Sequence, residues 1–233
     1  MGVQERRKRE REAREQQILA AAKELFVSEG YEGASIERIA AKIELSKRTI
    51  YLYFDSKDEL YYAVAKPGME TMAEMFRKAA AEEGNGLSKF ASIGIAYTEF
   101  WERYPDQRRI LNTTAFIKPP RTSGPRGRAF EEVSLDIIRT MMGTIAQGLE
   151  DGSIREGVDP LVAAFCISSS LQGVLQNLDS READLWAMEI PRKRMISETL
   201  GLFGKALANP GQDCESILRT KSKEVEGKGG REE

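Results

Sequence analysis

A short segment after Ser46 gathers side chains that can bind nucleic acid. If it forms a helix with Ser46 as its N-cap, Ile50 and Phe54 lie four residues apart and pack inward together. The other side chains then face outward, and they are two cations, a phenol and an aliphatic chain: Lys47, Arg48, Tyr51 and Leu52. Arginine can pair bidentately with guanine, and lysine can do so or bind a phosphate. Taken alone, the same side chains would also suit an ordinary solvated face.

The segment before it predicts a partner helix. Ser35 is placed as an N-cap, and a helical stripe of apolar residues follows: Ile36, Ile39, Ala40 and Ile43. Only Glu44 and Leu45 separate this helix from the next. Residues 35–54 therefore have the length and spacing of a helix-turn-helix, whose second helix enters the major groove of DNA.

The flanking helices complete a compact unit. The first should run from about Ala13 to Glu29, with Gly30 as a left-handed C-cap and Tyr31 folding back on the last turn. The next opens with a capping box in which Ser56 is the N-cap and Glu59 is N3. Pro67 and Gly68 should then kink or end that helix.

Lys57 occupies the first position of this fourth helix, where the helix dipole disfavours a cation by a few tenths of a kcal/mol or more. A phosphate bound beside it, held also by free backbone N–H groups, would account for the lysine.

The N-terminus is a second candidate DNA-binding element. Its cations are crowded together: Arg6, Arg7, Lys8, Arg9, Arg11 and Arg14. An arm of this kind can lie in a minor groove or along phosphates and become ordered on binding. The equal alternative is a disordered, solubilising terminus, since carboxylates interleave with the cations. The net charge of −2 for the whole chain does not oppose a local basic patch.

Composition removes most catalytic chemistry. The 233 residues include no histidine, so the commonest general base and metal ligand are missing, and Cys166 and Cys214 make no disulfide framework or thiolate metal site. No enzyme, cofactor or metal is expected. No run of eighteen apolar residues or secretory signal is seen, so we expect no membrane partner and a cytoplasmic, nucleoid-associated protein.

Apolar residues recur at helical spacing throughout and predict an all-α chain. Beyond the fourth helix, further helices are expected at about 69–82, 87–103, 106–116, 127–151, 160–178 and 190–208. The predicted division is a basic N-terminal arm (1–12), a helix-turn-helix domain (13–66), a helical-bundle domain for ligand binding and dimerisation (67–209) and a disordered tail (210–233).

The N-terminal pattern resembles the TetR family of transcriptional regulators over about residues 13–64. The resemblance rests on these residues in order: Ile18-Leu19-Ala20-Ala21-Ala22, Leu25-Phe26, Gly30-Tyr31, Ser35-Ile36, Ile39-Ala40, Leu45-Ser46-Lys47-Arg48-Thr49-Ile50-Tyr51-Leu52-Tyr53-Phe54 and Ser56-Lys57-Asp58-Glu59-Leu60. It implies that the DNA backbone is contacted by Ser35, Thr49, Tyr51, Tyr53 and Lys57. Lys47 and Arg48, which follow Ser46 in the same predicted DNA-binding set, would set base preference.

One position departs from the family, which usually has glycine where this chain has Glu44. A left-handed conformation at Glu44 would cost roughly 1 kcal/mol.

The resemblance also implies a homodimer in which the last two helices pair with their twins. Small residues that allow close helix approach favour the 160–178 helix for that role: Ala163, Ala164, Ser168 and Gly173. A small apolar or aromatic effector would contact aromatic, flexible and polar side chains: Tyr97, Phe100, Trp101, Asn112, Phe116, Met141, Met142, Phe165 and Gln172. Each of these helices and side chains could equally belong to a plain core.

The sequence therefore predicts a DNA-binding regulator, a repressor that binds an inverted-repeat operator of double-stranded DNA as a homodimer and is released by a small molecule. The alternative is an architectural or co-regulator-binding DNA protein with no small-molecule effector.

Overall fold

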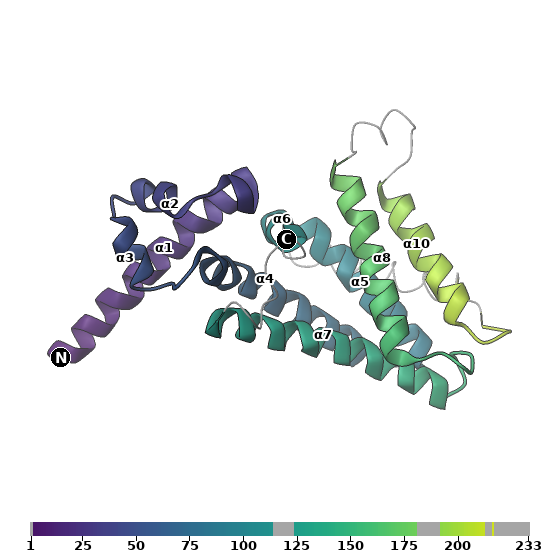
Figure 1. The fold of residues 1–233 in the computed structure, drawn as a ribbon. Coiled ribbons are helices and arrows are strands. Elements are labelled where there is room, and N and C mark those ends of the chain that lie inside the picture. The colour runs from purple at the N-terminus through teal and green to yellow at the C-terminus, as the bar shows by residue number, and fades with distance from the viewer. Residues whose placement is uncertain (1, 114–123, 181–191, 213–215, 217–233) are drawn as a thin grey trace, which may run out of the picture. The chain divides into compact units, whose positions relative to one another are not determined.

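The computed structural model describes residues 2–113, 124–180, 192–212 and 216, which form helices (Figure 1). Within these ranges the β pairing is one isolated bridge, between Ile154 and Ala208. The all-α prediction is confirmed. The helices are α1 (Val3–Gly33), α2 (Ile36–Lys42), α3 (Lys47–Tyr51), α4 (Lys57–Ala80), α5 (Gly86–Arg103), α6 (Pro105–Thr113), α7 (Pro125–Glu150), α8 (Pro160–Ser180) and α10 (Arg192–Leu207).

The chain forms two compact units, and their boundaries differ from the domain boundary predicted at residue 67. Unit 1 contains Met1–Thr71 and Tyr104–Ser134, and unit 2 contains Met72–Arg103 and Leu135–Glu233. The α6 helix therefore packs with the helix-turn-helix, where Lys23 of α1 pairs with Asp106 at 3.5 Å. Long helices can contribute to two cores, so a boundary read from sequence breaks misses such sharing. The predicted tail lies almost entirely outside the described residues.

The α1 helix begins ten residues earlier than the sequence indicated, at Val3. The predicted basic arm is therefore the first part of a helix, whose charged side chains alternate in i, i+4 pairs such as Arg6 with Glu10 at 2.9 Å. At the other end Gly30 interrupts the helical geometry with φ 72° and ψ −179°, so its φ is positive as predicted, but α1 continues after this break and ends at Gly33 instead of Glu29. The Tyr31 ring stacks on Phe26, as predicted, with centroids 6.2 Å apart.

Side-chain caps begin α2 and α3 as predicted. The Ser35 hydroxyl oxygen accepts a hydrogen bond from the Arg38 N–H at 3.2 Å, and the Ser46 oxygen accepts one from the Thr49 N–H at 3.1 Å. Each cap satisfies a backbone donor that the first helical turn leaves without a partner.

A Schellman motif ends α2 and sets the turn. The Leu45 N–H donates to the Ala40 carbonyl at 2.9 Å, and the Glu44 N–H donates to the Ala41 carbonyl at 3.2 Å. Glu44 is the left-handed residue of this motif, with φ 55°, and among the described residues it is the only non-glycine with positive φ. The strain anticipated at this position is therefore present.

The capping box of α4 is half formed, because the Glu59 carboxylate serves another helix. Ser56 accepts from the Glu59 N–H at 3.1 Å, as predicted. The Glu59 side chain, 4% exposed, instead accepts from the N–H groups of Arg126 and Gly127 at 3.1 and 2.9 Å and caps α7. Gly124 permits this approach: a Cβ there would lie 2.9 Å from the Glu59 carboxyl carbon.

The predicted end of the helix at Pro67 and Gly68 is wrong, since α4 continues through both residues to Ala80. Burial compensates for the backbone hydrogen bond that proline cannot make: Met69 is 8% exposed and Ala73 is 1% exposed. Gly68 allows α6 to approach closely, because a Cβ on Gly68 would lie 2.9 Å from the Gln107 side chain. The pair therefore serves packing in unit 1.

In unit 2, α10 packs on α5 and α8. The shared cluster is apolar: Trp101, Leu175, Leu178 and Ile196 are buried, with Tyr97, Val174, Met195 and Leu200 against them. Val174, Leu175 and Leu178 are the α8 members of this cluster, so one face of α8 packs against α5 and α10.

The other face of α8 is apolar and poorly covered. The segment Pro160–Leu178 has a mean hydropathy of 1.3 with 28% of it buried, so by length and composition it could cross a membrane, contrary to the sequence-based expectation. Leu161, Val162 and Phe165 are 50%, 58% and 60% exposed. Patches of this kind on a globular unit mark a surface that meets a partner.

Replacing Glu44 by glycine should stabilise the protein. Relief of the left-handed strain is worth roughly 1–2 kcal/mol, part of which the greater freedom of glycine in the unfolded chain offsets. We expect a net gain of about 0.5–1 kcal/mol and a melting temperature a few degrees higher at fixed protein concentration. Glu44→Ala is the matched control, because it removes the same charge but keeps Cβ. Equal melting temperatures for the two variants would contradict the argument from strain.

Candidate nucleic-acid interface

The α3 helix divides its side chains as the sequence predicted. Ile50 is fully buried and Phe54, just beyond the helix, is 2% exposed. Lys47 and Arg48 are exposed, and Tyr51 and Leu52 are 42% and 68% exposed. The five-residue α3 helix and its C-cap residue Leu52 therefore present two cations, a phenol and an aliphatic side chain on one surface of unit 1.

Three hydroxyl groups lie at the starts of α2 and α3. Ser35 and Ser46 each cap a helix through an oxygen lone pair, and each hydroxyl also carries a proton that it can donate. The Thr49 hydroxyl lies 2.8 Å from that of Ser46. Hydroxyls placed beside helix N-terminal N–H groups are suitable donors for phosphate oxygens.

Lys47 is held in place by neighbours on both helices of the motif. Its ammonium group donates to the Glu37 carboxylate of α2 and lies 5.8 Å from the centroid of the Tyr51 ring. The hydrogen bond between them raises the pKa of Lys47 and lowers the pKa of Glu37. Lys47 thus stays charged, but Glu37 partly neutralises its field.

Arg48 differs from Lys47 in its surroundings. It forms no ion pair with any residue that the structure describes, and it sits in the first turn of α3. Its guanidinium therefore keeps its full set of donors for a bidentate interaction with a base edge.

Lys57 has an intramolecular contact that the sequence did not suggest. Its Nζ lies 4.1 Å from the centroid of the Tyr31 ring, and the Tyr31 hydroxyl donates to Asp58. Burial, and then the hydrogen bond to Asp58, raise the pKa of Tyr31, so the phenol stays neutral. The Tyr31 ring therefore accounts for part of the preference for a cation at this position. The ring contact holds the ammonium at the α4 N-terminus, where a phosphate would be bound.

Tyr53 is half-buried between α3 and α4 and forms a cation–π contact. The guanidinium carbon of Arg11 lies 5.5 Å from the centroid of its ring. This contact brings the N-terminal part of α1 to the edge of the motif.

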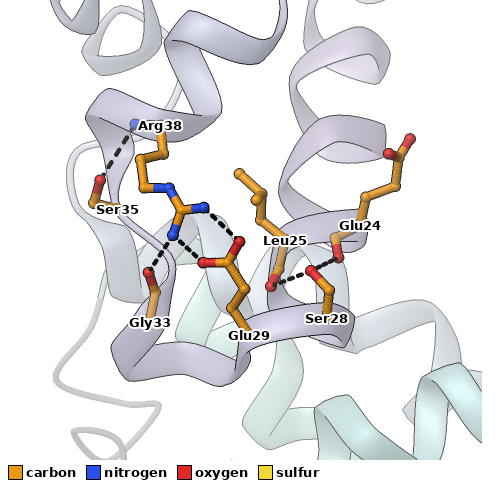
Figure 2. Close-up of polar contacts among 7 residues, drawn as sticks. All are labelled: Glu24, Leu25, Ser28, Glu29, Gly33, Ser35 and Arg38. Atoms are coloured by element: carbon orange, nitrogen blue, oxygen red, sulfur yellow. Dashed lines mark hydrogen bonds and ion pairs between the residues drawn. The ribbon is translucent and has the colours of Figure 1, made fainter.

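Figure 2 shows how α2 is fixed on α1. The Arg38 guanidinium forms two hydrogen bonds to the Glu29 carboxylate, one of 2.6 Å, and donates to the Gly33 carbonyl at 3.2 Å. A bidentate pair restrains orientation as well as distance. Since only four residues, 43–46, separate α2 from α3, this pair also fixes the orientation of the recognition surface.

A sequence profile of bacterial regulatory proteins of the tetR family matches residues 18–64, which contain this surface. Residues 18–64 therefore carry the DNA-binding domain of the TetR family. The protein is thus a transcriptional regulator with a DNA-binding helix-turn-helix, and the predicted family, fold and regulatory class are confirmed. The individual DNA contacts remain predictions.

Similar proteins cover most of the chain. The HTH-type transcriptional repressor AcnR of Corynebacterium jeikeium is 27% identical over 199 residues, which are 85% of this chain and 94% of AcnR. The activator FasR of Mycolicibacterium smegmatis is 28% identical over 113 residues, 48% of this chain and 52% of FasR. The structure of FadR from Bacillus subtilis in complex with stearoyl-CoA aligns with a TM-score of 0.60 and 20% identity, covering 82% of this chain and 98% of FadR.

The candidate effector residues lie in different parts of the structure. Tyr97 and Trp101 lie together in unit 2, with ring centroids 5.6 Å apart, and Phe76 joins Tyr97 at 6.0 Å. Burial raises the pKa of Tyr97. Phe100 and Met141 are buried, at 0% and 4% exposure. Of the other candidates, Met142 and Gln172 are half-buried. Asn112 belongs to unit 1.

Phe165 is not placed to line an enclosed pocket. It is 60% exposed on the uncovered face of α8, because the opposite face of that helix packs on α5 and α10. Phe116 lies outside the described residues.

Several contacts at the candidate interface could be identified only from the three-dimensional structure. Glu37 lies ten residues from Lys47, and Arg11 lies 42 residues from Tyr53. Neither separation has a helical or strand periodicity that would mark a contact. The one available signal was the crowding of cations near Arg11.

Base reading and backbone binding should separate in two variants. Arg48→Ala should cost roughly 1–3 kcal/mol at one base pair of each half-site and relax the preference there, because the variant cannot pair bidentately with a base. Lys57→Ala should weaken binding to all sequences about equally and lower the salt slope by about 1 for each phosphate that Lys57 neutralises. The measurement is affinity for single-base operator variants at several salt concentrations.

Lys23→Ala is the control for removal of one positive charge, since Lys23 pairs with Asp106 away from α3. If Arg48→Ala weakened all variants equally while Lys57→Ala relaxed one position, the two roles would be reversed. If neither variant differed from Lys23→Ala, this surface would not be the DNA-binding one.

Proposed function

We propose that this protein is a repressor that binds an inverted-repeat operator as a homodimer and is released by a small apolar or aromatic effector. The DNA-binding part rests on the exposed Arg48, which lies two residues before the buried Ile50 and is flanked by the groups predicted to contact the DNA backbone. The name of AcnR as a repressor supports repression. The protein would act in the cytoplasm, at the nucleoid.

The uncovered face of α8 supports the homodimer. Leu161, Val162 and Phe165 are exposed there, and Gly173 of the same helix has open space where a Cβ would stand. Leu202 adds an exposed apolar side chain on α10, at 68%. An isologous interface would cover these side chains in both subunits. Recognition helices roughly 35 Å apart would then reach successive major grooves.

The aromatic cluster of Phe76, Tyr97 and Trp101 supports an apolar effector. Rings interleaved with flexible methionine side chains can repack around an apolar ligand. The FadR structure, solved with stearoyl-CoA, makes acyl-CoA thioesters the first probes to test.

Effector release requires a path from unit 2 to unit 1. The α4 helix has residues in both units, and so does α7. A shift of both helices that alters the spacing of the recognition helices would reduce operator affinity. A coupling of a few kcal/mol is sufficient to change promoter occupancy.

Selection of operators from random duplex DNA is the first test of this function. We expect an inverted repeat, with half-sites about one helical turn apart. Stearoyl-CoA and shorter acyl-CoA thioesters are then added to the complex, and operator affinity and melting temperature are measured. A ligand that binds tightly without changing operator affinity would favour the alternative of an architectural or co-regulator-binding protein.

The dimer is tested by Phe165→Glu, which places two charges in the proposed interface. We expect the wild type to sediment as a dimer at micromolar concentration and the variant as a folded monomer with weaker operator binding. Leu135→Glu is the control, because Leu135 is 45% exposed on α7. A monomeric wild type, or one that partitions into lipid vesicles through α8, would contradict this proposal.

A further inference from the structure

The first four turns of α1 form an exposed helix before its core begins. Residues from Val3 to Arg14 are all exposed, and the first fully buried side chain is Ile18. An isolated helical segment of this length is marginal in water, so its charges must be consistent with helix formation. Arg6 with Glu10 and Lys8 with Glu12 provide two i, i+4 pairs, at 2.9 and 3.9 Å.

One face of this segment carries cations without matching carboxylates. Arg7, Arg11 and Arg14 precede Ile18 at helical spacing, so they continue the face that buries Ile18 and Ala22 in the core of unit 1. None of the three forms an ion pair with a carboxylate in the described ranges. Arg14 donates to the neutral Gln17 side chain at 2.9 Å.

Of the four carboxylates before Ile18, all but Glu5 pair with cations other than these arginines. Glu10 and Glu12 pair with Arg6 and Lys8, and Glu15 pairs with Arg126 of α7. The paired carboxylates therefore offset cations on other faces and leave the field of the three arginines uncompensated.

Arg11 shows which way the arginine face points. Its guanidinium lies over the ring of Tyr53, two residues beyond the end of α3. The face is therefore turned toward the side of unit 1 that carries α3. Along the helix axis Arg7 and Arg14 are about 10 Å apart, which spans about three base pairs of one DNA strand.

We propose that Arg7, Arg11 and Arg14 of α1 bind the phosphate backbone of the same DNA that α3 reads. The segment does so as a preformed helix, without becoming ordered on binding and without reading bases. This inference rests on the proposed DNA-binding function and adds a second DNA-binding surface to it. Charge complementarity selects the partner, since a row of uncompensated guanidinium groups matches a row of phosphates.

The test compares two triple variants of the full-length protein that remove equal charge. R7Q/R11Q/R14Q neutralises the proposed face, and R6Q/K8Q/R9Q neutralises other faces of the same helix. Glutamine preserves helix propensity, and circular dichroism checks that both variants keep the wild-type helix content. Affinity is measured for the selected operator and for a random-sequence duplex across a range of salt concentrations.

If all three arginines of each subunit bind a phosphate in the dimer, the face variant should lower the salt slope by about 5, because each neutralised phosphate contributes about 0.9 to it. Its affinity for operator and random DNA should fall by the same factor, while the control variant changes little. Equal effects of the two variants would overturn the proposal, and so would a changed base preference in the face variant. Failure of the wild type to select an operator would refute the proposed repressor, but the random duplex would still test this face.

Discussion

Burial of Ile50 and Phe54 is the constraint on which the DNA-binding surface depends. Both side chains are almost fully enclosed, and Ile39 of α2 is also at 0% exposure in the same core. A five-residue helix cannot be stable by itself, so α3 exists only because these residues anchor it. Once they are buried, helical geometry places Lys47 and Arg48 in solvent. The recognition surface is therefore fixed by hydrophobic packing, with the caps and the Glu44 turn setting where the helix begins.

The cationic side chains of that surface differ in whether other residues of the protein already restrain them. Lys47 is bound to Glu37, and Lys57 rests on the Tyr31 ring, so the side chains of both are already restrained before any DNA arrives. Fixing such a chain later would cost up to about 2 kcal/mol of entropy. Arg48 has no such restraint among the described residues, and it can adjust to the edge of a base pair. The restraint on Lys57 suits its predicted phosphate contact, since phosphate positions hardly vary with sequence.

Sequence reasoning succeeded where the signal was local. The Ser35 and Ser46 caps, the positive φ of Gly30 and the inward stripe ending at Ile50 each depend on residues within one or two helical turns. It failed where an interaction crosses the chain. Glu59 fits a capping box by spacing, but its carboxylate caps α7 through a residue 67 positions away. The predicted end of α4 at Pro67 and Gly68 failed because tertiary burial carries the helix past both residues. The late start predicted for α1 failed for a local reason: ion pairs one turn apart, such as Arg6 with Glu10, extend the helix into the charged segment.

The same Glu59 side chain constrains how a signal can reach the recognition helix. It bonds the first turn of α4 to the first turn of α7, and both helices continue into unit 2. Gly68 packs against Gln107, so α4 has no open space on this side at the position where the sequence predicted a kink or an end. The starts of α4 and α7 should therefore move as one piece. Hydrogen bonds to a charged group contribute about 1.5–3 kcal/mol, similar to a typical allosteric coupling energy. A joint of that strength can stay closed while the two helices shift, so the effector signal proposed for this protein should pass through both helices together.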